Sequence, residues 1–168
     1  MTKEYISIRI LLGGCRMNIE FRPIDRTNYN ECIDLSLSEE QKKFVAPNMF
    51  SLVQAAYEPD LYPLAIYNED KMVGFILYDF DSKVNGWSMS RFMIDVKYQN
   101  QGIGKIALQK FIEFFANKHG NLKLYTSAEI DNTIATSLYE KFGFQRKEIF
   151  EYEFGGRVYR EVRMVLQI

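Results

Sequence analysis

The chain alternates between apolar segments that predict strands and longer segments with helical spacing. A strand is predicted where every second residue is apolar, or where a short apolar run is bounded by turn residues. These segments are residues 19–23, 64–67, 72–80, 86–96 and 121–128, followed by two alternating segments around the turn FGGR near the end of the chain. The turn NEDK, which joins the second and third segments, predicts a β-hairpin.

Helices are predicted where apolar residues recur every three or four positions. These segments are residues 28–38, 39–57, 102–118 and 131–144. The last one begins with an Asx cap and has Gly143 close to its end, as helices commonly do. Because strands and helices are mixed along the chain, the pattern predicts an α+β fold built on one mixed, mostly antiparallel sheet.

The composition is that of one folded domain. The chain has 168 residues, of which 47% are apolar and 26% charged, and its net charge is −1. Disordered and low-complexity classes are therefore excluded. Charges interrupt every apolar run before the roughly 18 residues of a membrane helix are reached, so we expect a soluble protein without membrane partners. The small net charge offers no basic surface for nucleic acid.

The two cysteines and the start of the chain give little sign of special chemistry. Cys15 and Cys32 lack the paired spacing of a zinc site, so no metal is expected and a reducing cytoplasm fits. The apolar patch over residues 6–12 has neither the length nor the cleavage site of a secretion signal. We interpret residues 1–16 as an N-terminal extension and residues 17–168 as one domain.

The stretch YQNQGIGK, residues 98–105, places two glycines between a predicted strand and a predicted helix. Its glycine spacing excludes a Walker A loop, and no early βαβ unit supports a dinucleotide fingerprint. Backbone N–H groups at the start of a helix favour a bound anion. Taken alone, the stretch leaves open a glycine turn that serves only the backbone geometry.

The surrounding sequence resembles a known family. The segment FMIDVKYQNQGIGKIALQKFI is similar to motif A of the GCN5-related N-acetyltransferase (GNAT) family, whose (R/Q)xxGx(G/A) turn wraps the pyrophosphate of acetyl-CoA. NTIATSLYEKFGF, residues 132–144, matches the family's second signature, N-x-x-A-x-x-L-Y-x-x-x-G-F, at every fixed position. The run SRFMID is most similar to bacterial spermine and spermidine (polyamine) acetyltransferases. The resemblance implies the GNAT fold, a sheet of about six to seven strands with about four helices.

The resemblance implies that acetyl-CoA is the co-substrate and that Tyr139 is the general acid. The residues it assigns to acetyl-CoA are Phe92, Met93, Ile94, Asn100, Gln101, Gly102, Ile103, Gly104, Lys105, Asn132 and Tyr139. One N–H group, that of Met93 or Ile94, would polarise the thioester carbonyl. A phenol with a reference pKa of about 10 can protonate the leaving thiolate. Structural alternatives stay open: core packing for Tyr139, helix capping for Asn132 and a solvated charge for Lys105.

The general base is less sharply defined by the sequence. An alkylamine with a pKa near 10.4 arrives as an ammonium, so a carboxylate or a water relay must take a proton. Glu129 follows a predicted strand and is the candidate base, with a solvated loop residue as its alternative. Asp95, before the glycine turn, is a second candidate. The single histidine, His119, is interpreted as the C-terminal cap of a helix.

Charge along the chain gives a hint about the acceptor. Residues 20–95 contain 13 acidic and 7 basic residues, whereas residues 96–168 contain 8 acidic and 11 basic ones. This division suits an anionic cofactor and a cationic acceptor. Acidic residues that could form an amine-binding cleft, unless they are merely a solvated face, are Glu31, Asp34, Glu39, Glu40, Asp79 and Asp81.

The predicted function is that of an acyltransferase, an acetyl-CoA-dependent N-acetyltransferase. A primary amine, best a polyamine such as spermidine, would attack the thioester directly, because neither cysteine lies near the two motifs. The alternatives are acetylation of a protein N-terminus or lysine, acetylation of an aminoglycoside-type amine, and a non-catalytic acyl-CoA sensor. The aromatic-rich terminal hairpin is a candidate surface for a homodimer, since edge strands can pair.

Overall fold

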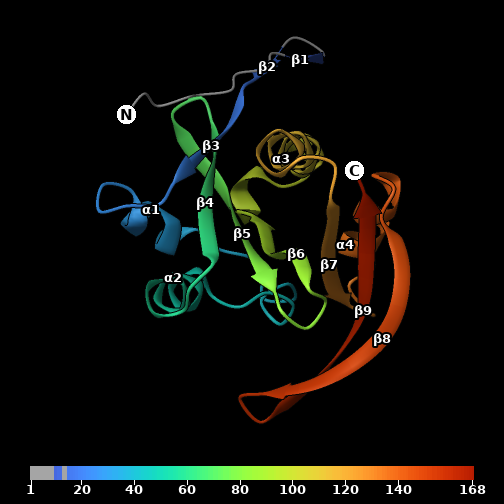
Figure 1. Ribbon diagram of the computed structural model, residues 1–168. Helices are drawn as coiled ribbons and strands as arrows, with labels where there is room; N and C mark the ends of the chain where they lie inside the picture. The colour runs from blue at the N-terminus through green and yellow to red at the C-terminus, as the bar shows by residue number, and fades with distance from the viewer. Residues whose placement is uncertain (1–9, 13–14) are drawn as a thin grey trace. The chain divides into compact units, whose positions relative to one another are not determined.

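The computed structural model describes residues 10–12 and 15–168, with one seven-stranded mixed sheet and four α-helices (Figure 1). The strands of this sheet are β3 (Ile19–Pro23), β4 (Leu61–Asn68), β5 (Lys71–Asp81), β6 (Gly86–Ile94), β7 (Lys123–Glu129), β8 (Gln145–Phe154) and β9 (Arg157–Gln167). The helices are α1 (Tyr29–Asp34), α2 (Asn48–Tyr57), α3 (Ile103–His119) and α4 (Thr133–Lys141), with a short 3-10 helix η1 at Val96–Tyr98. The strand order is β3-β4-β5-β6-β7-β9-β8. The pair β6–β7 is parallel, and β3–β4, β7–β9 and β8–β9 are antiparallel.

The chain forms two compact units, and each has its own core. The first unit comprises Met1–Leu77 and Arg91–Lys110, and the second comprises Tyr78–Ser90 and Phe111–Ile168. In the first unit α2 lies beside β4 (Figure 1). The buried cluster of this unit is Cys32, Ala65, Tyr67, Met72, Phe75, Leu77 and Met93. Fully burying a Leu, Phe or Met side chain contributes about 1.5–3 kcal/mol, so the cluster stabilises this unit.

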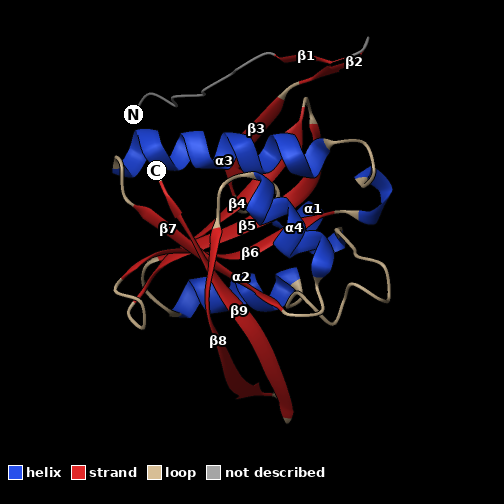
Figure 2. Cartoon of the chain, turned by 90° about the vertical axis from the view of Figure 1, so that its right-hand side faces the viewer, coloured by secondary structure: helices blue, strands red, loops and turns tan. Residues whose placement is uncertain are grey.

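In the second unit, aromatic packing and a long hairpin dominate. The ring of Tyr78 packs edge-on against Phe111, with 5.6 Å between ring centroids. Strands β8 and β9 form a long antiparallel ribbon (Figure 2). Nearly all of β8 is exposed, whereas β9 alternates and buries Val162 and Met164. The ribbon is therefore held largely by cross-strand contacts rather than by burial on both faces.

The predicted strands and the two later helices are confirmed, with small changes of length. The hairpin strands, for example, extend to Leu61–Asn68 and Lys71–Asp81. The helix predicted over residues 39–57 is wrong in its first half, because α2 begins at Asn48. Residues 39–44 form turns instead. Ala46 precedes Pro47, which disfavours helical backbone there and delays the start of the helix.

The helix predicted over residues 28–38 is also too long, since α1 ends at Asp34. Beyond it, the backbone of Ser36 is held by another segment. Its N–H donates to Asp95 Oδ2 at 2.8 Å, and its carbonyl accepts from the Val96 N–H at 2.9 Å. These tertiary hydrogen bonds take the place of helical ones.

The predicted N-terminal extension lies mostly outside the described residues. Its described parts, β1 (Ile10–Leu12) and β2 (Cys15–Met17), form a separate two-stranded sheet. The boundary after residue 16 falls within β2, and the division into an extension and a domain stays a prediction.

Candidate functional site

The glycine turn lies between η1 and α3 in the first unit, and two residues with left-handed backbone shape it. Asn100 has φ 60° and Gly102 has φ 81°. Asparagine tolerates this conformation, and glycine adopts it without steric cost. A Cβ on Gly104 would lie 3.5 Å from Ile94 Cγ1. The start of α3 therefore packs closely on the end of β6, while Gln101 and Gly102 are exposed.

The backbone N–H groups of this turn fit an anion. The first helical hydrogen bond of α3 runs from the Ile106 N–H to the Gly102 carbonyl at 3.2 Å. The N–H groups of residues 103–105 precede it, so they have no acceptor within the helix. They donate to no other described residue either. Together with a helix dipole worth about half a positive charge, they could hold the pyrophosphate of acetyl-CoA.

At the end of β6, residues 92–94, the groups considered for binding the cofactor are those of the backbone, because the side chains are buried or half-buried. Met93 and Ile94 are buried, and Phe92 is half-buried. The pairing of β6 with β7 covers only Trp87–Met89. A Cβ on Gly74 would lie 2.4 Å from the Met93 carbonyl oxygen, so β5 and β6 are close at this point. These side chains therefore pack in the core, as the alternative interpretation predicted. The binding of pantetheine by their backbone stays a prediction.

Asp95 fixes the backbone just before the glycine turn through hydrogen bonds. It is buried, its Oδ2 accepts from the Ser36 N–H at 2.8 Å, and its Oδ1 accepts from the Lys97 N–H at 2.9 Å. Four residues after Asp95, the amide of Gln99 donates to Gln41 at 2.9 Å, and the amide of Gln41 donates to Gln99 at 3.1 Å. With both oxygens engaged by backbone donors, Asp95 has a structural task that competes with its candidate role as a base.

In the second unit, α4 begins with the predicted cap. Asn132 Oδ1 accepts from the Ala135 N–H at 3.2 Å, which satisfies one free donor of the first turn. The backbone N–H of Asn132 donates to the Glu129 carbonyl at 2.8 Å. The side-chain Nδ2 donates to none of the described residues. Capping and a contact to pantetheine are therefore compatible.

Tyr139 is buried on α4, with 5% of its surface exposed and its ring centroid 5.6 Å from that of Phe144. Burial raises the pKa of Tyr139 to about 12; a hydrogen bond with Thr126 opposes this rise and the Glu161 carboxylate adds to it. The Thr126 hydroxyl donates to the Met89 carbonyl at 2.9 Å. The phenol therefore stays protonated at neutral pH and remains a proton donor.

The carboxylate of Glu129 has a partner that the sequence did not indicate. Arg157 Nη2 donates to Oε1 at 2.8 Å and to Oε2 at 2.9 Å. The Glu129 side chain is only 13% exposed, so it is not the solvated loop residue of the alternative interpretation. A base must take up a proton, and a proton on Glu129 would neutralise the charge that pairs with Arg157.

A polar and aromatic face of β7, β9 and β8, which sequence reasoning missed, surrounds this ion pair. Glu161 accepts from the hydroxyls of Ser127 and Tyr152. The rings of Tyr152 and Tyr159 stack at 5.1 Å, and Arg157 lies 4.4 Å from the Tyr159 ring centre. Alternation along β9 places residues 157, 159 and 161 on one side. Only the strand register brings Ser127 and Tyr152 to them.

Neither His119 nor Cys32 is arranged for catalysis. His119 ends α3, as predicted, and its ring centroid lies 4.1 Å from that of Trp87. Burial lowers the pKa of His119, and Lys118 adds to the fall, so the neutral ring is favoured. Burial raises the pKa of the Cys32 thiol to about 12, with a further contribution from the Glu31 carboxylate.

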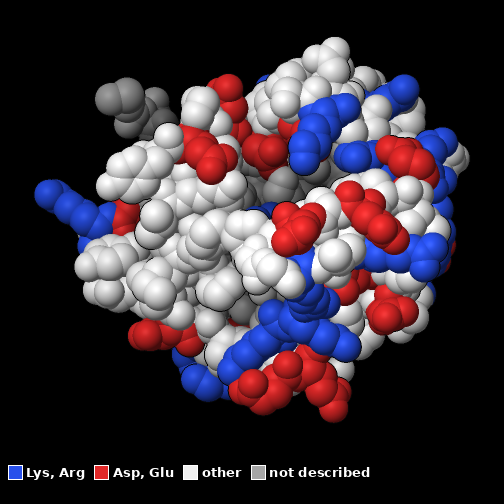
Figure 3. Space-filling view, turned by 90° about the horizontal axis from the view of Figure 1, so that it is seen from below, with Lys and Arg blue, Asp and Glu red and all other residues white. Residues whose placement is uncertain are grey.

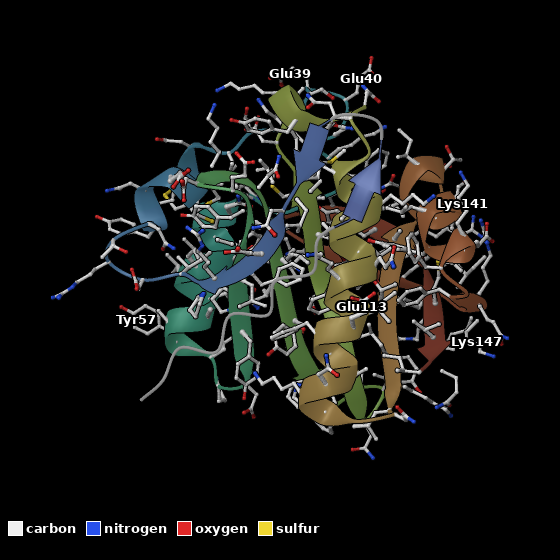
Figure 4. All side chains as sticks on the ribbon, turned by 90° about the horizontal axis from the view of Figure 1, so that it is seen from above. Glu39, Glu40, Tyr57, Glu113, Lys141 and Lys147 are labelled. Atoms are coloured by element: carbon white, nitrogen blue, oxygen red, sulfur yellow. The ribbon has the colours of Figure 1, made fainter. Side chains whose placement is uncertain are left out.

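The acidic residues considered for amine binding fall in both units. Those of the first unit are Glu31, Asp34, Glu39 and Glu40. Glu31 accepts from the Tyr67 hydroxyl at 3.0 Å and from the Met72 N–H at 2.9 Å, which is a structural role. Glu39 pairs with Lys42, and Figure 4 shows Glu39 and Glu40 at the periphery of the structure.

In the second unit, both acidic candidates already have partners. Asp79 accepts from the Ser90 hydroxyl. Asp81 accepts from the Lys83 N–H at 2.8 Å and lies 3.8 Å from Arg163. Charges of both signs also lie beside one another on the face shown in Figure 3. An acidic acceptor cleft therefore stays a prediction.

No group of three or more His, Cys, Asp or Glu residues in residues 10–12 and 15–168 could hold a metal ion. None of the helices described there has the length and apolar character needed to cross a membrane.

The chain is similar to a known protein family and to a curated relative. The family model described as acetyltransferase (GNAT) family matches residues 27–144. The chain is 30% identical over 135 residues to the spermine/spermidine N(1)-acetyltransferase of Bacillus subtilis (strain 168), covering 77% of this chain and 89% of the relative.

Solved structures share the fold. A chimera of the Vibrio cholerae spermidine N-acetyltransferase SpeG and hSSAT has a TM-score of 0.67 at 14% identity, covering 89% of this chain and 95% of the other. A ribosomal-protein alpha-N-acetyltransferase, RimL, in complex with coenzyme A has a TM-score of 0.71 at 13% identity, covering 96% and 98%. At these identities the similarity concerns the fold alone.

Proposed function

This chain belongs to the acetyltransferase (GNAT) family and is an N-acetyltransferase, and we propose that it moves the acetyl group of acetyl-CoA to a polyamine such as spermidine. We infer a polyamine acceptor from the similarity to the Bacillus spermine/spermidine acetyltransferase, which extends over most of both chains. A primary amine attacks the thioester directly, because the buried Cys32 thiol stays protonated and is a poor acetyl carrier.

In this proposal the first unit binds the donor through its backbone. The N–H groups at the start of α3 hold the pyrophosphate, and the glycines at positions 102 and 104 let it approach closely. The backbone of residues 92–94 pairs with the pantetheine amides, and one N–H there polarises the thioester carbonyl. The Nδ2 of Asn132, which donates to none of the described residues, is the side-chain donor assigned to the pantetheine.

Tyr139 protonates the sulfur only as it receives another proton. A phenol with a pKa of about 12 is a weaker acid than a thiol. With a thiol pKa of about 8.5, leaving Tyr139 ionised would cost roughly 5 kcal/mol. We therefore assign Tyr139 the role of a relay, which gives its proton to sulfur while accepting one from the nitrogen of the attacking amine.

The test is thiol release from acetyl-CoA with spermidine, a diamine, an aminoglycoside and peptides that present an α-amine or a lysine. Spermidine is expected to give the highest kcat/KM. A preference for a peptide amine would show that the acceptor is not a polyamine. If thiol release is no faster than background with every one of these amines, the proposed acetyl transfer to an amine is refuted.

A further inference from the structure

Two carboxylates face each other across the pairing of β7 with β9. Glu129 and Glu161 are directly opposite residues in this antiparallel register, so their side chains leave the sheet on the same side. Like charges in opposite positions destabilise a sheet unless other groups compensate them. The two carboxylates are compensated in different ways.

Glu129 is compensated by a cation. Arg157 donates to both oxygens of its carboxylate, at 2.8 and 2.9 Å. A guanidinium has donors only and keeps its charge throughout the accessible pH range. A proton added to Glu129 would remove the negative charge that pairs with Arg157, so protonation of this carboxylate would disrupt the ion pair.

Glu161 is held by neutral hydroxyls. Its Oε1 accepts from the Tyr152 hydroxyl at 2.8 Å, and its Oε2 accepts from the Ser127 hydroxyl. Among the described Lys and Arg residues, none forms an ion pair with it. Hydroxyls both donate and accept, and they rotate. Ser127 and Tyr152 can therefore turn and accept from Glu161 after it takes up a proton.

We propose that Glu161, rather than Glu129, is the general base that takes a proton from the acceptor ammonium. The inference rests on the proposed function, because an alkylammonium has no lone pair for attack until a proton leaves it. The nitrogen loses two protons in all. One goes to Glu161 and then to solvent. The other replaces the proton that Tyr139 gives to sulfur, while the carbon–nitrogen bond forms and the carbon–sulfur bond breaks.

The charge of Glu161 also acts on the predicted acid. Beyond the effect of burial, the Glu161 carboxylate raises the pKa of Tyr139. Acid and base partners in active sites are commonly groups whose environments push their pKa values apart. The other charged or titratable groups beside Glu161 are Glu129 on β7, Tyr152 on β8, and Tyr159 and Arg163 on β9. None of them is a histidine, so a dependence on pH below neutrality would report a carboxylate.

The test compares Glu161→Gln with Glu129→Gln, which remove one charge each at facing positions. At position 161, glutamine keeps one acceptor oxygen for one hydroxyl, and its amide nitrogen can donate to the other hydroxyl, because hydroxyls also accept. Urea unfolding checks that both variants fold. For spermidine, Glu161→Gln is expected to lower kcat/KM on the order of 100-fold or more and to flatten its acid limb. Glu129→Gln is expected to keep the shape of the native pH profile.

A second readout separates a base from a structural residue. The loss in Glu161→Gln should be smaller for a peptide α-amine, with a pKa of about 8, than for an alkylamine near 10.4, because more of the α-amine is already neutral. Equal losses for both amines, or a native pH profile in Glu161→Gln, would overturn the proposal. Absence of turnover in the native protein would instead refute the proposed function.

Discussion

The glycine turn of the first unit and the polar face of the second unit are built in opposite ways. In the turn, the groups available to a ligand are backbone N–H groups, and residues matter chiefly through their φ values. On the face of β7, β9 and β8, side chains such as Glu129, Arg157 and Glu161 make the arrangement. The difference predicts that side-chain changes act strongly in the second unit, whereas glycine substitutions act strongly in the first.

The largest expected effect is that of Tyr139→Phe, which removes a single oxygen from the second unit. We expect kcat to fall on the order of 100-fold or more, because the leaving sulfur loses its proton donor. KM for acetyl-CoA should change little, since the glycine turn is untouched. Thiol release from acetyl-CoA with spermidine measures both quantities.

The control for this variant is Tyr57→Phe. Tyr57 is 88% exposed on α2, and Figure 4 shows it at the periphery. Full turnover in Tyr139→Phe would show that the Tyr139 phenol is not the proton donor to sulfur.

The same tyrosine should also set an alkaline limit to stability. Because the folded pKa of Tyr139, about 12, lies above the reference value of 10, folding favours the protonated phenol. Its contribution is present below about pH 10 and is lost as the pH rises towards 12, a change of about 2.7 kcal/mol. Urea unfolding of the native protein and Tyr139→Phe over this range measures it. Parallel alkaline losses in the two proteins would contradict the buried phenol.

In the first unit, Gly102→Val tests the role of the backbone. A β-branched residue at φ 81° is strained by about 1–2 kcal/mol, so the turn should leave this conformation in the free protein. Because binding would have to restore it, coenzyme A should bind roughly 5- to 30-fold more weakly. Lys105→Ala, which removes a neighbouring exposed cation, should cost less. Calorimetric titration with coenzyme A compares the two variants. If the lysine variant loses more affinity than the glycine variant, side chains and not backbone hold the anion.

The contrast also explains what the sequence could predict. The glycine turn and its strand and helix occupy consecutive residues, so spacing alone located them, and α3 and α4 begin within two residues of expectation. The ion pair of Glu129 and Arg157 joins residues 28 positions apart. It depends on strand register, which alternation does not fix. The turns at residues 39–44 were missed for a related reason, because Gln41 forms hydrogen bonds to the distant Gln99 and Pro47 disfavours helix before it.

The smallest expected effect concerns Cys32. Its thiol is a reactive type of side chain, but it lies in the first unit, where backbone N–H groups are expected to bind the cofactor. Because burial raises the pKa of Cys32 to about 12, only about one molecule in 10⁵ carries the thiolate at neutral pH. In a Cys15→Ser background, iodoacetamide should label Cys32 only after unfolding, and Cys32→Ala should keep native turnover per folded molecule. Rapid labelling of the folded protein, or loss of turnover in the alanine variant, would indicate an acetyl-cysteine and place side-chain chemistry in the first unit.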